Sequence, residues 1–94
     1  REARRVRTSV LDLALSLAAS WARDLAATSA GAEEVVFNVD RLEVLREQSR
    51  DVSMAAARKA VGVVADTRQR FQLNVSEELA MEALCFRLEK LLSP

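Results

Sequence analysis

Glycine occurs only twice in the 94 residues of this chain, at positions 31 and 62, and proline occurs once, at position 94. Tight turns between strands depend on these residues, so the sequence lacks the turns that a many-stranded sandwich or barrel needs. Two glycines also exclude a glycine-rich phosphate-binding loop. A chain of this length forms one domain, and we expect that domain to be all-α.

The chemistry available to the chain is narrow, because it contains no histidine and a single cysteine, Cys85. Without histidine, no Ser-His or Cys-His nucleophile pair and no histidine metal site can form. Adjacent acids such as Glu77 and Glu78 diverge on a helix, which argues against paired acid-base catalysis. We therefore expect a non-enzymatic domain with no cofactor, no metal ion and no small-molecule substrate.

Basic and acidic side chains balance, and this formal net charge of zero does not favour general nucleic-acid binding. Arginines cluster at positions 1–7, so a DNA-binding helix that uses them remains an alternative function. The longest apolar run, residues 13–19, contains Ser16 and is too short to cross a membrane. We expect a cytoplasmic protein. Because the sequence starts at Arg1 without methionine, we also expect it to be a fragment of a longer chain.

Apolar residues recur at steps of three and four through residues 1–27, which predicts one long helix or two in succession. One stripe consists of Val6, Val10, Leu13, Ala14, Leu17, Trp21 and Leu25. A second stripe beside it consists of Leu11, Leu15, Ala18 and Ala22. Two adjacent stripes predict a helix that is buried on two sides, and Gly31 is expected to end it in the left-handed conformation.

The segment after this helix is predicted to connect it to a short second helix. Residues 33–39 include a Val-Val-Phe run whose side chains we expect to fill the core. Asp40 is expected to begin the second helix, with Glu43 at the spacing of a capping box. This helix is predicted to end near Arg50.

Two longer helices complete the predicted bundle. Asp51 or Ser53 is expected to cap a helix that continues to about Gln72, and Ser76 is expected to cap the last one. The predicted buried face of the last helix consists of Leu79, Ala80, Ala83, Leu84, Leu88, Leu91 and Leu92, with Cys85 packed within it. The expected fold is a small bundle of about four to five helices in a single domain, residues 1–94.

Polar residues interrupt the apolar surroundings at several places: Arg23, Asp24, Asn38, Arg68 and Asn74. Buried polar groups need hydrogen-bond partners, so we expect these side chains to bond to loop backbone and to helix ends. Contacts with another subunit are the alternative. Trp21 carries a large ring with one polar group, which is typical of core or interface packing.

Four segments carry a family resemblance by their order and spacing: residues 21–25 (Trp-Ala-Arg-Asp-Leu), 37–40 (Phe-Asn-Val-Asp), 73–75 (Leu-Asn-Val) and 79–84 (Leu-Ala-Met-Glu-Ala-Leu). Together they resemble the C-terminal domain of the delta-prime subunit of the bacterial DNA polymerase III clamp loader. The resemblance spans residues 21–92, which is most of the chain.

The resemblance implies a helical collar domain that assembles subunits and hydrolyses nothing. In such clamp loaders, five related subunits carry ATPase-type modules, and their C-terminal domains close into a ring. The ring holds the modules together while they open a sliding clamp and place it on primed DNA. The implied partners are the gamma/tau and delta subunits, with DNA contacted only through the complex.

We take eight residues as structural or interface candidates: Trp21, Arg23, Asp24, Asn38, Asp40, Arg68, Asn74 and Glu82. A homo-oligomeric helical scaffold remains a further alternative, because proteins without net charge associate readily.

Overall fold

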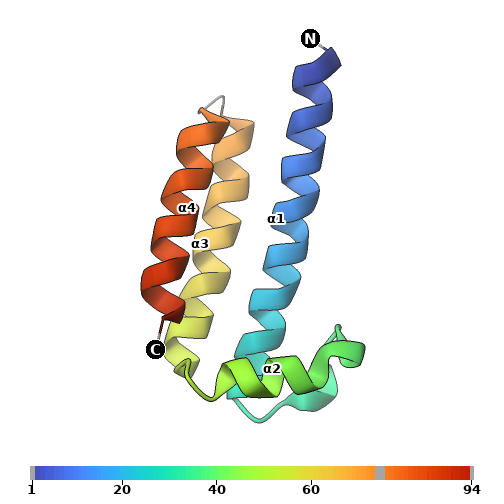
Figure 1. The fold of residues 1–94 in the computed structure, drawn as a ribbon, viewed down its shortest axis with the longest axis vertical. Helices are drawn as coiled ribbons and strands as arrows, with labels where there is room; N and C mark the ends of the chain where they lie inside the picture. The colour runs from blue at the N-terminus through green and yellow to red at the C-terminus, as the bar shows by residue number, and fades with distance from the viewer. Residues whose placement is uncertain (1, 74–75, 94) are drawn as a thin grey trace.

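The computed structural model describes residues 2–73 and 76–93, and the regular structure in these ranges is entirely helical (Figure 1). The four α-helices are α1 (Glu2–Ser29), α2 (Leu42–Ser49), α3 (Met54–Gln72) and α4 (Glu77–Leu92). Two single 3₁₀ turns, η1 (Glu33–Val35) and η2 (Val39–Arg41), lie between α1 and α2. The prediction of a small all-α bundle is confirmed.

The first helix is continuous, and it ends at the predicted glycine. Gly31 has a φ of 77°, in the left-handed region that only glycine adopts without a steric penalty. The N–H groups of Gly31 and Ala32 donate to the carbonyl oxygens of Thr28 and Ala27 at 3.1 and 2.8 Å. These bonds satisfy carbonyl groups in the last turn of the helix, where the regular helical donors run out.

The three long helices lie side by side, with α3 between α1 and α4, and α2 crosses the far end of α1 (Figure 1). The 28 residues of α1 give it a length of about 42 Å, against about 24 Å for the 16 residues of α4. The molecule is correspondingly elongated, with extents of 44 × 25 × 16 Å. Its radius of gyration, 14.2 Å, exceeds the roughly 12 Å of a compact domain of this length.

Two buried clusters hold the helices together. One joins α1, α3 and α4 through Leu15, Val63, Val64 and Leu84. The other joins α1, the connecting segment, α2 and α3 through Leu25, Val36, Leu45 and Ala57. Small residues such as Ala57 and Ala60, both fully buried, let α3 approach its neighbours closely.

The connecting segment contributes less to the core than its sequence predicts. Of its apolar side chains only Val36 is buried, whereas Val35, Phe37 and Val39 are 61 %, 71 % and 69 % exposed. The backbone of η1 and η2 turns tightly, and therefore it cannot aim consecutive side chains at a single core. The prediction that this segment fills the core is confirmed for Val36 and wrong for Val35, Phe37 and Val39.

The prediction that Asp40 begins and caps the second helix is wrong. Asp40 lies within η2, and α2 begins at Leu42 without a side-chain cap. The chain has already turned by this point, because the N–H of Arg41 donates to the carbonyl oxygen of Asn38 at 2.9 Å. This 3₁₀ turn takes the place of the predicted capping box.

Serine caps begin both later helices, as the sequence predicts. The Ser53 hydroxyl accepts from the Ala56 N–H at 3.0 Å, and the Ser76 hydroxyl accepts from the Leu79 N–H at 3.4 Å. Asp51, the other candidate cap for α3, lies in the preceding turn.

We predict that Ser53→Ala lowers the free energy of unfolding by about 1 kcal/mol, because it leaves the Ala56 N–H without this acceptor. Urea denaturation followed by circular dichroism measures the change. Ser9→Ala, at an exposed position within α1, is the matched control and is expected to change stability by less than about 0.5 kcal/mol. Equal midpoints for the two variants would show that the cap contributes nothing.

Candidate functional site

Two of the motifs found in the sequence, residues 21–25 and residues 37–40, meet at the end of α1 nearest α2. Asp24 is 1 % exposed, and its carboxylate accepts hydrogen bonds from the backbone N–H groups of Phe37 and Asn38 at 2.9 and 2.8 Å. The Asn38 side-chain amide donates to the same carboxylate. As expected from the sequence, Asp24 bonds to loop backbone, and it fixes the connecting segment to α1.

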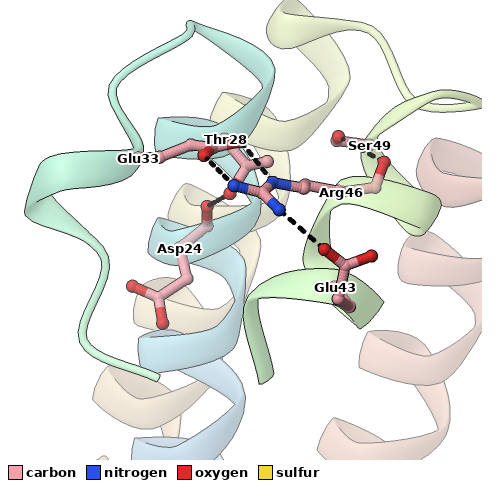
Figure 2. Close-up of polar contacts among 6 residues, drawn as sticks. All are labelled: Asp24, Thr28, Glu33, Glu43, Arg46 and Ser49. Carbon is pink, nitrogen blue, oxygen red and sulfur yellow. Dashed lines mark hydrogen bonds and ion pairs between the residues drawn. The ribbon is translucent and has the colours of Figure 1, made fainter. Parts of the chain in front are cut away.

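The surroundings of Asp24 keep its carboxylate ionised. Burial alone would raise the pKa of Asp24, but the N–H donors of Phe37 and Asn38, with the nearby Arg23, hold this pKa below its ordinary value. Thr28, also buried, donates its hydroxyl to the Asp24 carbonyl oxygen at 2.8 Å, as Figure 2 shows. The cluster is fully used in holding the fold, so it is a structural element.

The two residues on either side of Ala22 reinforce the same junction. The Arg23 guanidinium lies over the Phe37 ring, 5.3 Å from its centroid. The half-buried Trp21 donates its indole N–H to Gln48 of α2 at 2.9 Å. The first motif therefore connects α1 both to the segment after it and to α2.

A further polar cluster joins η1 to α2, and its residues were not among the candidates chosen from the sequence. Arg46 donates two hydrogen bonds to Glu33, at 2.9 and 2.7 Å, and one to Glu43, at 2.6 Å (Figure 2). The bonds from Arg46 lower the pKa of Glu33, and the two carboxylates raise the pKa of Arg46. The i,i+3 spacing of Glu43 and Arg46 was visible in the sequence, whereas nothing local marked Glu33.

The remaining candidates do not join the Asp24 cluster. Arg68 was expected to bond to backbone, but it pairs with the Asp12 carboxylate of α1, at 3.3 and 3.4 Å. Asp40 and Glu82 are exposed, in η2 and α4. Asn74 lies outside the described residues.

The described part of the chain offers no grouping suited to metal chemistry. Within residues 2–73 and 76–93, no three Cys, Asp or Glu side chains are placed to hold a metal ion. None of the described helices combines the length and the apolar character of a membrane-crossing segment.

An exposed apolar surface lies along α1. Val6, Val10, Leu13 and Leu17 are 60 %, 58 %, 60 % and 64 % exposed, and together they form the α1 face. The second predicted stripe, which includes Leu15 and Ala22, is the buried one. The first predicted stripe is exposed from Val6 to Leu17 and buried only at its end, at Leu25. The prediction that α1 is buried on two sides is therefore wrong for its first two-thirds.

A second apolar surface lies on α4. Leu79 and Phe86 are 64 % and 59 % exposed, and with the exposed Ala83 they form the α4 face. Ala80 and Leu84 are buried, as the sequence predicts, whereas the prediction of burial is wrong for Leu79, Ala83 and Cys85, which are exposed on the side of α4 away from its contact with α3. Cys85 is accordingly an exposed thiol.

These two faces can bind other apolar surfaces, and this is the chemistry that the described residues support best. No family model matches the chain, and comparisons with curated proteins and with solved structures also return no match.

Proposed function

We propose that this chain is a non-catalytic assembly domain, whose helices pack against other subunits of a larger complex. The observation that carries the proposal is the pair of exposed apolar surfaces, the α1 face and the α4 face, on two different helices of a small domain. Monomeric proteins rarely expose contiguous apolar stripes of this kind, which are typical of protein–protein contacts.

The particular complex we propose is the bacterial DNA polymerase III clamp loader, with this chain as the collar domain of its delta-prime subunit. The motif resemblance supports this assignment. Its first two motifs bind each other directly, because Asp24 of one accepts two hydrogen bonds from Asn38 of the other. A contact of this kind gives a physical reason for the two motifs to occur together.

In this role, the domain would hold subunits together and would catalyse no reaction. Its partners would be the gamma/tau and delta subunits, and the ATPase-type modules would reside elsewhere in the cytoplasmic complex. The two apolar faces would let one domain contact two neighbours, which is what a closed ring of subunits requires.

Co-purification tests this function. The 94-residue chain and the full-length delta-prime subunit are each mixed with the gamma/tau and delta subunits of the same organism. We expect both to be retained, the isolated domain more weakly, and the isolated domain to hydrolyse no ATP. Retention of the full-length subunit with no binding of the domain at any concentration would contradict the proposal.

A further inference from the structure

A groove between α3 and α4 is not used by any contact described so far. It has a volume of about 460 Å³. Its lining residues are Lys59, Gly62, Val63, Arg87, Lys90 and Leu91. The buried Val63 and the half-buried Leu91 form an apolar floor. The groove is therefore an open depression between two helices, a place where a third helix can pack.

Nothing among the described residues explains why position 62 is glycine. It lies in the middle of α3, where glycine is unfavourable compared with alanine. A Cβ atom built at this position meets no atom within 4 Å, and its backbone is not in the left-handed region. Neither close packing nor backbone geometry within the described structure requires glycine here. A partner that approaches the backbone of α3 closely at this position would give a reason for glycine.

The charges around the groove have one sign. Lys59 of α3 and Arg87 and Lys90 of α4 line it, and no acidic residue does. Asp66 lies 3.6 Å from Arg87, but it also pairs with Arg70 at 3.2 Å. The groove therefore presents cations that complement a partner with carboxylates.

The groove is also continuous with the α4 face. The Lys90 ammonium lies 4.8 Å from the centroid of the Phe86 ring, so one residue borders both surfaces. A helix lying in the groove would be able to contact Phe86 as well.

We propose that this groove receives an amphipathic helix of a neighbouring clamp-loader subunit. Small or apolar residues of that helix face Gly62, and its acidic residues face Lys59, Arg87 and Lys90. This inference rests on the proposed function, and it specifies which kind of partner helix binds in the groove between α3 and α4.

The test compares variants of the full-length delta-prime subunit for binding to the purified gamma/tau and delta subunits. Gly62→Leu fills the groove, and Lys59→Glu with Lys90→Glu reverses its charge. Each is expected to weaken binding about tenfold or more. Ala65→Leu, exposed on α3, and Arg41→Glu with Arg50→Glu, exposed beyond the groove, are the matched controls and are expected to bind like wild type.

Thermal unfolding of Gly62→Ala provides an independent readout. We expect its Tm to rise by about 3 °C, because alanine favours the helix and its Cβ meets no atom. A lower Tm would mean that the fold itself needs this glycine, which would overturn the argument.

The outcomes separate the two proposals. Failure of the wild-type subunit to bind would overturn the proposed function and, with it, this inference. Normal binding by wild type and by both groove variants would overturn this inference alone. Unchanged subunit binding, together with a loss of affinity for a primed DNA duplex in the charge-reversed variant, would assign the groove to DNA instead.

Discussion

Replacing Asp24 with alanine is expected to lower the free energy of unfolding by about 3 kcal/mol. The carboxylate is buried and accepts bonds from the backbone N–H groups of Phe37 and Asn38 and from the Asn38 amide. Alanine would leave all these donors without their acceptor and would release the connecting segment from α1. Urea denaturation of the 94-residue chain measures the loss.

Two controls separate this contact from a general effect of removing a carboxylate. Asp24→Asn retains the size of the side chain but loses its charge, and we expect it to be destabilised by about 1–2 kcal/mol. Asp40→Ala removes an exposed carboxylate from the same region and is expected to change stability by less than about 0.5 kcal/mol. A loss for Asp24→Ala no greater than that for Asp40→Ala would contradict the structural role of Asp24.

The same contact predicts how stability depends on pH. The pKa of Asp24 is lower in the folded chain than in the unfolded chain, so the unfolded state takes up a proton first as the pH falls. The stabilisation is therefore complete near neutral pH and is lost on acidification below about pH 4. The Asp24→Asn variant is expected to lose less stability than wild type between pH 5 and pH 2.

Charges placed in the α1 face are expected to weaken subunit binding by about 100-fold without unfolding the domain. Val10→Asp with Leu13→Asp puts two carboxylates where the proposed partner contributes apolar side chains. Both positions are more than half exposed in the isolated chain, so the fold tolerates the change. Fluorescence anisotropy of labelled variants with the proposed partners, the gamma/tau and delta subunits, measures the affinity.

Val35→Asp is the matched control for this experiment. Val35 is apolar and about as exposed as Val10 and Leu13, but it lies in η1, away from the α1 face. It is expected to bind within about twofold of wild type. Equal affinities for the control and for the double variant would show that the α1 face contacts no partner.

The sequence was sufficient to predict the four helices and most of their ends, the start of α2 excepted, because these depend on local chemistry. Gly31 ends α1 through a backbone conformation that other residues rarely adopt, and Ser53 begins α3 through a hydroxyl acceptor. The bonding of Asp24 to loop backbone was also predicted, since a buried acid near the end of an apolar helix needs donors, but the sequence did not single out Phe37 and Asn38 as those donors.

The sequence could not predict that the first stripe of α1 would be exposed from Val6 to Leu17. The stripes that contain Leu13 and Leu15 both have helical periodicity, and only the position of α3 decides that Leu15 is covered and Leu13 is not. Leu79 on α4 was misassigned for the same reason. An apolar periodicity indicates a surface that binds something, whether that is the chain's own core or another subunit.

The sequence also could not predict the long-range polar contacts. Arg68 pairs with Asp12 and Arg46 pairs with Glu33, across separations that no local pattern encodes. Both contacts depend on the final packing of helices, and both lie at exposed positions where a change in partner would alter stability little.

The mass of the assembled complex tests the central claim most directly. Sedimentation velocity would compare the proposed complex of the parent subunit with gamma/tau and delta, with and without the 94 residues described above. The assembly role predicts one large species with the intact subunit and separate, smaller species once these residues are removed. A complex of the same mass and stability without them would contradict it.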